Sequence, residues 1–438
     1  MFGTSGIRGE VGKEVTAELA IDVGRVLASD GAERVVVGRD TRITGQFLAD
    51  AVSAGARECG ADVVRLGTSA TPSVARGVEW YDADAGVVVT ASHNPPKDNG
   101  IKLWNPSGQA FDTRQRATVA RRIRNEDYDL QSWRSIGTET SASDVKERHA
   151  KTLADRTEPL DGLSVVVDIG NGAGGVTADA LRRLGCAVRT LDGQADGHFP
   201  GREIEPTDEA TVDLGTLVGA GDADFGVAHD GDADRLMAVT DDGEYVPGDV
   251  LLALFARERA DAGDRVAVPL NTSMLVDDVL DGVGASVVRT QVGDVFVAEA
   301  ATADDVVFGG EPSGAWIWPE ETLCPDGALA ACRLAAFVSR HGSLSSSVAD
   351  IGTYPTLRDS VRVDDRESVM ERVTRRLRER YDDVDDTDGV RIELDDGWFL
   401  IRASGTQPLV RVTAEAEDES RAEEIFQQAR TVVSNETR

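Results

Sequence analysis

The sequence predicts an α/β protein with three similar domains in series, each with a mixed sheet, followed by a smaller C-terminal α+β domain, around a central cleft. Its length of 438 residues corresponds to three or four domains at roughly 100 to 200 residues each. Short β-branched runs alternate with helical patterns, and this rhythm starts three times along the chain. After the third start, the pattern changes to consecutive strands flanked by charged helices, which is typical of an antiparallel sheet covered on one face.

The first domain is expected over residues 1–145. Its strands are predicted at residues 35–38, 62–67 and 85–92, with a helix at residues 46–60. Strands in this rhythm form a largely parallel sheet. The charged stretch from about residue 112 to residue 160 is expected to be rich in helix and to separate this sheet from the next one.

The three later domains are expected over residues 146–240, 241–352 and 353–438. The predicted strands are 164–170, 186–190 and 225–230 in the second domain, 264–270, 285–290 and 304–310 in the third, and 389–394, 397–404 and 409–416 in the last. A helix is expected to end near Gly185, and two more are predicted at residues 365–381 and 418–433.

The composition indicates a soluble globular chain. Hydrophobic residues make up 41% and charged residues 28% of the sequence, which is enough apolar material for packed cores. No apolar run approaches the ~20 residues that cross a bilayer, and the first residues do not resemble a signal peptide. We therefore expect a cytoplasmic location.

The net charge excludes two classes of partner and predicts a salt-rich environment. The net charge is −32, whereas nucleic acids and anionic membranes bind basic surfaces. Only five of the 46 basic residues are lysines, namely Lys13, Lys97, Lys102, Lys146 and Lys151. At about 1 M salt the Debye length falls to ~3 Å, so repulsion among carboxylates is screened. The sequence therefore predicts a halophilic protein from a salt-rich cytoplasm; an ordinary acidic protein is the alternative.

Cysteine and histidine spacing predicts neither a disulfide framework nor a zinc site. The four cysteines, Cys59, Cys186, Cys324 and Cys332, form no Cys-x-x-Cys pair, and the five histidines have no metal-ligand spacing. We expect the cysteines to be small buried apolar residues.

The stretch at residues 86–104 places a serine directly after an apolar strand. Ser92 and His93 are followed by Pro95 and Pro96, which force the chain out of regular structure. A serine held in this way can be a nucleophile or a phosphate carrier if a base or a metal activates it. Lys102 begins the next apolar run. An ordinary turn is the alternative, because serine and asparagine favour turns.

The stretch at residues 225–239 alternates three carboxylates with small residues. Asp230, Asp232 and Asp234 repel one another unless a cation neutralises them. Oxygen ligands select a hard ion, and Mg²⁺ is favoured where a phosphate fills a remaining position. A calcium-binding EF-hand loop is disfavoured because Arg235 stands where glycine is needed. A solvated acidic turn is the alternative.

Two further stretches carry sugar-binding and anion-binding residue types. Glu311 and Ser313, in a glycine-rich turn, offer an acceptor and a hydroxyl that suit sugar hydroxyls, although a plain loop fits equally well. The turn between the last two strands contains Arg402, Ser404, Gly405 and Thr406, with Arg411 on the following strand. Such a turn can form a phosphate nest, and a hairpin with exposed arginines is the alternative.

The residues alone also allow two other functions. Gly170, Gly172 and Gly175 match G-x-G-x-x-G between a predicted strand and helix, with Asp192 following, which would indicate an NAD-binding oxidoreductase. That interpretation leaves the serine loop, the aspartate triplet and the arginine turn unexplained. Alternatively, Asp230 could be the nucleophile of a Mg²⁺-dependent aspartyl-phosphate phosphatase, and Ser92 would then be incidental.

Taken together, these stretches resemble the α-D-phosphohexomutase family from FGTSGIRG at the start to RASGTQP near the end. The resemblance implies that Ser92 is phosphorylated in the resting enzyme and that Asp230, Asp232 and Asp234 hold Mg²⁺ together with that phosphoserine. It implies that Glu311 and Ser313 bind sugar hydroxyls and that Arg402 through Gln407 grip the substrate phosphate. Arg8 and Lys102 fall where the family places a phosphate-contacting arginine and a candidate general base; His93 is a further catalytic candidate, and Arg235 and Arg411 are further substrate-binding candidates.

The resemblance is strongest to the archaeal phosphoglucosamine mutase branch, through GGEPSGAWIWPE and CPDG, with two departures from the family pattern. Gln407 stands where glutamate is usual, and Ala315 stands where many relatives have histidine. The activity implied is the interconversion of hexose 6-phosphate and hexose 1-phosphate through a hexose 1,6-bisphosphate, with glucosamine phosphate favoured and mannose or glucose phosphate as alternatives. The expected partner is a small sugar phosphate, and the expected state is a monomer or a homodimer.

Overall fold

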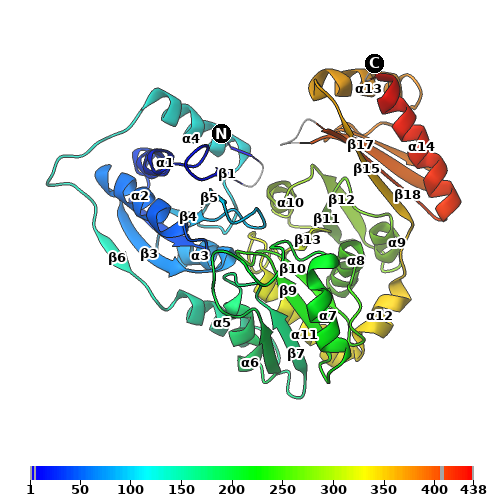
Figure 1. Cartoon of the computed structure of the whole chain (residues 1–438), viewed down its shortest axis with the longest axis horizontal. Helices are drawn as coiled ribbons and strands as arrows, with labels where there is room; N and C mark the ends of the chain where they lie inside the picture. Colours follow the sequence, from blue (N-terminus) through cyan, green and yellow to red (C-terminus); the bar gives the residue numbers. More distant parts are fainter. Residues whose placement is uncertain (1, 4–5, 405–408, 437–438) are drawn as a thin grey trace. The chain divides into compact units, whose positions relative to one another are not determined.

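The computed structural model describes residues 2–3, 6–404 and 409–436 and contains four sheets, one after another along the chain (Figure 1). Three sheets are mixed or contain parallel strands, and the last is antiparallel, so the predicted fold class is confirmed. The chain separates into two compact units, residues 1–251 with 312–349 and residues 252–311 with 350–438. Among the described helices, none is both long enough and apolar enough to cross a membrane.

The first sheet has the strand order β1-β5-β4-β2-β3-β6. Its elements are β1 (Ile7–Glu10), α1 (Ala17–Ser29), β2 (Arg34–Arg39), α2 (Gly45–Glu58), β3 (Asp62–Thr68), α3 (Thr71–Trp80), β4 (Ala85–Val89), β5 (Asp98–Trp104), α4 (Thr113–Asn125) and β6 (Glu139–Ser141). Strands β4, β2, β3 and β6 are parallel neighbours, while β5 pairs antiparallel with both β4 and β1. The polar residues that follow β2 and β4 therefore emerge at the same edge of the sheet.

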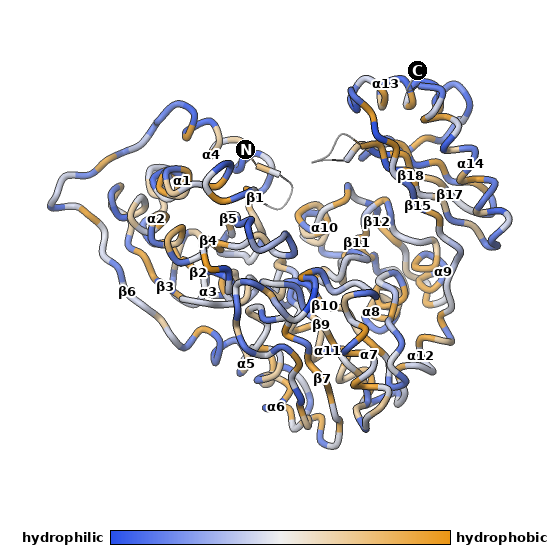
Figure 2. The backbone as a smooth tube through the Cα atoms, in the orientation of Figure 1, coloured by the Kyte–Doolittle hydropathy of each residue, from blue (hydrophilic) through white to orange (hydrophobic). Residues whose placement is uncertain are grey.

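Helices cover both faces of this sheet because its central strands are apolar on both sides. In β2, Val35 and Val37 pack with α1 and α2, whereas Val36 packs with α3. Figure 2 shows the apolar character of these strands. Near-continuous Val runs are typical of parallel strands that are buried on both faces.

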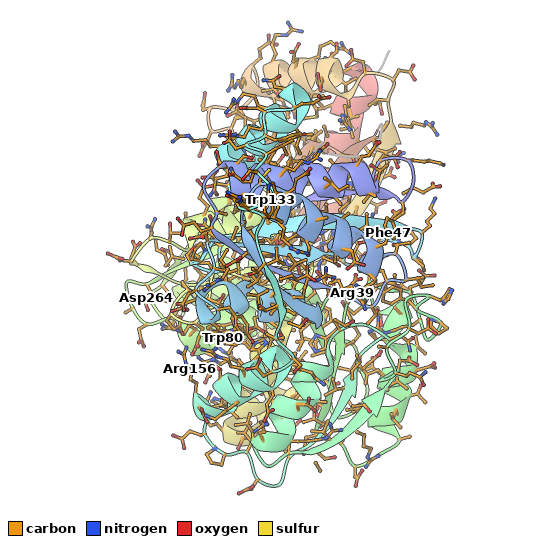
Figure 3. All side chains as sticks on the ribbon, turned by 90° about the vertical axis from the view of Figure 1, so that its left-hand side faces the viewer. Arg39, Phe47, Trp80, Trp133, Arg156 and Asp264 are labelled. Carbon is orange, nitrogen blue, oxygen red and sulfur yellow. The ribbon has the colours of Figure 1, made fainter. Side chains whose placement is uncertain are left out.

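The charged stretch from about residue 112 to residue 160 contains two helices, α4 and α5 (Val145–Asp155), as predicted. Between them, residues 126–144 contain the short edge strand β6. The stretch leaves Trp133 80% exposed, with Arg134 stacked on its ring (Figure 3).

The second sheet, β10-β9-β7-β8, repeats the pattern of parallel central strands with one antiparallel edge. Its elements are β7 (Ser164–Asp168), α6 (Gly175–Arg183), β8 (Ala187–Leu191), a 3₁₀ turn (Glu209–Thr211), α7 (Val212–Gly219), β9 (Phe225–His229) and β10 (Leu236–Val239). Strand β9 is completely buried. It delivers the aspartate loop at its carboxyl end, where ligands bind in open α/β sheets.

The third sheet has the order β12-β11-β13-β14, with β11 parallel to both β12 and β13. Its elements are α8 (Gly248–Arg259), β11 (Arg265–Pro269), α9 (Leu275–Asp281), β12 (Ser286–Thr290), α10 (Asp294–Ala300), β13 (Val306–Glu311) and β14 (Ala315–Ile317), and two helices follow, α11 (Gly327–His341) and α12 (Leu344–Ile351).

The C-terminal sheet is fully antiparallel, in the order β15-β18-β17-β16. Its elements are β15 (Thr356–Arg362), α13 (Arg366–Arg378), β16 (Val390–Leu394), β17 (Gly397–Ala403), β18 (Leu409–Ala416) and α14 (Glu419–Glu436). Helices α13 and α14 cover one face, against Phe399, Ile401 and Val412 (Figure 1). The other face carries Arg402 and Arg411 as cross-strand neighbours.

Candidate active site

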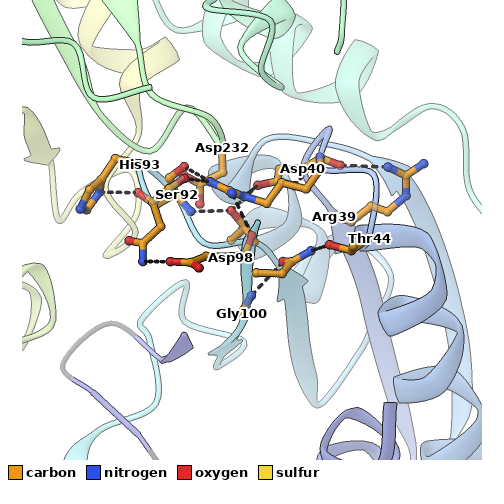
Figure 4. Close-up of polar contacts among 12 residues, drawn as sticks. Arg39, Asp40, Thr44, Ser92, His93, Asp98, Gly100 and Asp232 are labelled. Atoms are coloured by element: carbon orange, nitrogen blue, oxygen red, sulfur yellow. Dashed lines mark hydrogen bonds and ion pairs between the residues drawn. The ribbon is translucent and has the colours of Figure 1, made fainter. Parts of the chain in front are cut away.

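Ser92 lies in a buried, strained turn directly after strand β4. Its φ is 52°, a left-handed conformation that costs a residue other than glycine about 1 kcal/mol or more. Ser92 is 1% exposed. Its Oγ donates a hydrogen bond to Asp230 Oδ2 at 2.6 Å. His93 Nδ1 lies 3.1 Å from the same Oγ (Figure 4). The turn therefore holds the hydroxyl against the aspartate loop.

Arg42 holds this turn in place, and sequence reasoning missed it. The guanidinium is completely buried. It donates at 2.6–2.9 Å to the backbone carbonyls of Ser92, Asn94, Pro95 and Asp98. The polar run from Arg39 to Arg42, at the end of strand β2, is the feature of the sequence that could have identified Arg42. That run occupies the same strand-end position as Ser92 does after β4.

Asp40 completes the support of the turn. It accepts from Arg42 Nε at 3.0 Å and from Thr90 Oγ1 at 2.7 Å, and Thr90 Oγ1 in turn accepts from the Ser92 amide at 2.9 Å. Burial raises the pKa of Asp40 to about 6, although the adjacent Arg42 opposes the rise. A buried ion pair with its hydrogen bonds satisfied in this way fixes geometry rather than adding much stability.

The three aspartates converge as the sequence predicts. One carboxylate oxygen from each of Asp230, Asp232 and Asp234 lies within 4.8 Å of the others, and all three residues are buried. Burial raises the pKa of Asp230 well above its ordinary value, and the charges of Asp232 and Asp234 raise it further. Both causes disfavour the ionised form of the Asp230 carboxyl.

Lys102 and Thr71 are the partners of this cluster. Lys102 Nζ donates to Asp232 Oδ2 at 2.8 Å and to Asp234 Oδ2 at 2.5 Å. Thr71, which sequence reasoning missed, donates to Asp232 Oδ2 at 2.5 Å. Burial opposes the ionisation of Asp232, but Lys102 and Thr71 outweigh it and lower the pKa of this carboxyl.

One structural observation indicates that this cluster of carboxylates suits a hard metal ion. Asp232 Oδ1 is buried and has no hydrogen-bond partner among the described residues. An orphaned carboxylate oxygen in a dry site is costly unless a cation binds it. The ligand set is oxygen only, which is the set that Mg²⁺ prefers.

His93 is held in its neutral form. Burial and the charges of Arg235, Arg8 and Lys102 lower its pKa to about 2. At neutral pH the ring can therefore accept a hydrogen bond at one nitrogen and donate at the other.

Arg235 pairs with Glu205 at 2.8 Å, and its backbone amide lies 3.3 Å from Asp230 Oδ1.

The G-x-G-x-x-G turn has a packing role. A Cβ on Gly172 would lie 2.6 Å from the carbonyl oxygen of Gly231, and one on Gly231 would lie 2.7 Å from that of Ser92. The Ala173 amide also donates to the Gly231 carbonyl at 3.0 Å. Gly172 therefore allows the turn after β7 to pack against the aspartate loop, and Gly231 allows that loop to pack against Ser92, so close backbone packing accounts for Gly172 without a dinucleotide.

A buried Ser–His–Asp arrangement elsewhere in the first unit is structural. His149 lies between Ser73 Oγ at 2.8 Å and Asp326 Oδ2 at 3.0 Å. Arg76 pairs with the same Asp326 oxygen. All four side chains are buried, so no substrate reaches the serine. Asp326 also accepts from the first amides of α11.

The remaining predicted residues lie in separate parts of the chain. Glu311 ends β13 and accepts from the Gly293 amide at 2.8 Å; Ser313 follows in the next turn. Arg402 pairs with Asp388 at 3.3 Å, and Ser404 is buried with its carbonyl held by Arg366. Three of the predicted phosphate-binding residues, Gly405, Thr406 and Gln407, lie outside the described residues.

Comparison with protein families matches almost the whole chain. The descriptions "Phosphoglucomutase/phosphomannomutase, alpha/beta/alpha domain" I, II and III match residues 1–129, 144–243 and 247–354, respectively. The description of the C-terminal domain of the same family matches residues 360–432.

Curated relatives of similar length come from archaea. A protein of Methanopyrus kandleri named "Probable phosphoglucosamine mutase" is 46% identical over 433 residues, which cover 97% of this chain and 95% of the relative. A protein of the same name from Methanococcoides burtonii is 42% identical, with 99% and 98% covered.

Solved structures share the fold. A phosphoglucomutase/phosphomannomutase family protein from Burkholderia thailandensis has a TM-score of 0.87 at 26% identity, covering 100% of this chain and 99% of that one. An N-acetylphosphoglucosamine mutase from Aspergillus fumigatus, solved with GlcNAc-6P and magnesium, has a TM-score of 0.63 at 15% identity, covering 100% and 96%. The second likeness is one of fold alone.

Proposed function

This chain belongs to the phosphoglucomutase/phosphomannomutase family and is therefore a phosphohexomutase, an isomerase, and from that premise we propose that phospho-Ser92 is its phosphoryl carrier. We propose a 1,6-bisphosphate intermediate and glucosamine phosphate as the preferred substrate. The observation that carries the proposal is the strained, buried Ser92, whose Oγ lies 2.6 Å from Asp230 within a cluster of three carboxylates.

In the proposed transfer, a sugar hydroxyl attacks the phosphorus of phospho-Ser92. The bond from phosphorus to Ser92 Oγ breaks, a bond from phosphorus to the sugar oxygen forms, the sugar hydroxyl loses its proton, and the released Ser92 Oγ takes up a proton. Lys102 is the candidate acceptor of the sugar's proton once its ammonium has passed a proton to one of the carboxylates it contacts, Asp232 or Asp234. After the bisphosphate turns around, the opposite phosphoryl group returns to Ser92 by the same bond changes.

Asp230, Asp232 and Asp234, with an oxygen of phospho-Ser92, would hold Mg²⁺, which when bound would offset negative charge on the transferring group. The orphaned Asp232 Oδ1 supports this assignment. Arg42 and Asp40 keep the serine turn rigid, and neutral His93 offers a hydrogen bond beside Oγ. Electrostatic stabilisation and positioning account for most catalysis of phosphoryl transfer.

Other predicted residues are assigned to substrate binding. We assign the phosphate that is not reacting to Arg402, Ser404, Gly405, Thr406, Gln407 and Arg411. Glu311 and Ser313 would contact the sugar hydroxyls, and Arg8 and Arg235 would contact phosphate oxygens. The planar guanidinium of each of these arginines can donate two hydrogen bonds to one phosphate group.

The aspartyl-phosphate reading remains the second candidate because of one contact. Asp230 lies so close to Ser92 Oγ that either side chain could carry the phosphoryl group. In that reading Asp230 would be the nucleophile. The comparison of Ser92 and Asp230 variants described in the Discussion separates the two candidates.

Replacing Arg42 by lysine should reduce kcat by about a hundredfold and leave KM nearly unchanged. Lysine keeps the charge but cannot donate to four carbonyls in one plane, so the turn that aims Ser92 loosens, and a displacement of about 1 Å can cost about a hundredfold. Steady-state kinetics test this. The matched control is Arg39→Lys, because Arg39 contacts Gln46 and the Asp40 carbonyl instead. Full activity in Arg42→Lys would remove the positioning role.

Glucosamine 6-phosphate should have a kcat/KM roughly ten to a hundred times that of glucose or mannose 6-phosphate. Glu311 is 8% exposed, and a shielded carboxylate favours the cationic 2-amino group over a hydroxyl by about 1 to 3 kcal/mol. The assay compares the three sugars side by side, each with its matching 1,6-bisphosphate. Glu311→Gln should narrow the gap. A higher kcat/KM for mannose 6-phosphate would replace this assignment with phosphomannomutase.

A further inference from the structure

The face of the C-terminal sheet that α13 and α14 leave uncovered carries a basic pocket of about 400 Å³. Its lining includes three arginines, Arg358, Arg402 and Arg411, together with Asn271, Ser360 and the carboxylate Asp359. Arg402 and Arg411 belong to the strands around the predicted phosphate loop. Arg358 belongs to β15, which follows the third domain and contains no motif that the sequence analysis singled out.

The strand register gathers the three guanidiniums on one face. Arg402 lies directly opposite Arg411, Arg411 lies opposite Ser360, and Arg358 lies two residues before Ser360. Alternate residues of a strand share a face, so Arg358 is a diagonal neighbour of Arg411. Like charges on neighbouring strands repel each other. An anion between these side chains would relieve that repulsion.

Among the described residues, two of the three arginines, Arg358 and Arg411, have no carboxylate partner, which is unusual in so acidic a chain. The sequence has 78 acidic and 46 basic residues, and Arg402 pairs with Asp388 at 3.3 Å. Neither Arg358 nor Arg411 forms an ion pair with any residue in the described part of the chain. The acid adjacent to Arg358 in sequence, Asp359, pairs with Arg430 of α14 at 3.0 Å instead.

Asn271 adds an acceptor to the pocket. Its Oδ1 is buried and has no partner among the described residues. Arg391 holds the neighbouring carbonyls of Leu270 and Thr272 and stacks on Trp398, with its guanidinium carbon 3.8 Å from the ring centroid. The segment that carries Asn271 is therefore fixed beside the arginines. An unpaired acceptor next to cationic groups suits a ligand that carries both an anion and a hydroxyl or amine donor.

We propose that Arg358, outside the loop at residues 402–407, is a third guanidinium for the non-reacting phosphate of the sugar monophosphate, beside Arg402 and Arg411. The inference rests on the proposed function for the identity of the sugar phosphate. Arg358 would add a phosphate contact from β15 to those from Arg402 on β17 and Arg411 on β18. Charge-assisted hydrogen bonds from a guanidinium to phosphate are among the stronger polar contacts in proteins.

The test is equilibrium binding to the full chain, by calorimetry at fixed ionic strength, with inorganic phosphate and glucosamine 6-phosphate as separate probes. Arg358→Gln should raise the Kd for both probes by about tenfold, and Arg358→Lys should recover part of the loss because it keeps the charge. The matched control is Arg376→Gln, which removes the same charge from α13, where Arg376 pairs with Glu436, and should leave both Kd values unchanged. In steady-state kinetics, Arg358→Gln should raise KM with little effect on kcat.

Two outcomes would overturn the inference. Kd values for both probes within twofold of the unaltered protein would exclude Arg358 as a ligand. Weaker binding of inorganic phosphate alone would indicate a free-anion site and not a sugar-phosphate site. Binding does not require turnover, so loss of both affinities in a protein without mutase activity would support the pocket while rejecting the proposed function.

Discussion

Replacing Ser92 by alanine should lower mutase activity by at least roughly a thousandfold, because the proposed reaction has no phosphoryl carrier without Oγ. Intact mass and peptide mapping should find one phosphate on Ser92 in the unaltered protein and none in the variant. The fold should persist, since alanine fits the same buried turn. Ser69→Ala is the matched control, because Ser69 is also buried after a strand and donates only to the Leu66 carbonyl.

The same variant separates the two possible phosphoryl carriers. Normal activity in Ser92→Ala, together with an inactive Asp230→Asn that cannot be phosphorylated, would establish the aspartyl-phosphate mechanism. Loss of phosphate from Ser92→Ala with phosphate still incorporated by Asp230→Asn would instead establish the serine.

Removing divalent metal should abolish activity, and Mg²⁺ should restore it. Three buried carboxylates repel one another and raise the pKa of Asp230, so the cluster binds a compensating cation when it ionises. Calorimetric titration with Mg²⁺ should show binding that Asp232→Asn weakens by at least roughly a hundredfold, because that substitution replaces the orphaned oxygen and the partner of Lys102.

Asp213→Asn is the control for this measurement, since Asp213 lies on the exposed face of α7 outside the cluster. Full activity in excess chelator would contradict the metal assignment. So would equal Mg²⁺ affinity in Asp232→Asn and the control, because the titration reads the site directly and does not depend on turnover.

The sequence by itself was sufficient for the fold class and for the residues at the strand ends. Buried strands such as β2, β7 and β9 are continuous apolar runs, and that pattern is local. The polar residues after β4 and β9 were predicted because a strand end is also local in sequence. The strands without such runs, including β1, β6 and β15, were missed, since burial of an edge strand depends on its neighbours.

The tertiary structure decided how these residues combine. Ser92 and Asp230 are separated by 138 positions, so their contact depends on how two sheets pack. The contact of Thr71 with Asp232 follows from the same packing, whereas the place of Arg42 depends on the fold of the first domain and that of Arg358 on the register of the C-terminal sheet. Arginine is usually exposed, and nothing in its local sequence shows that the Arg42 guanidinium is buried among four carbonyls. Local patterns determine strands and the residues that follow them, whereas long-range packing decides which of those residues come into contact.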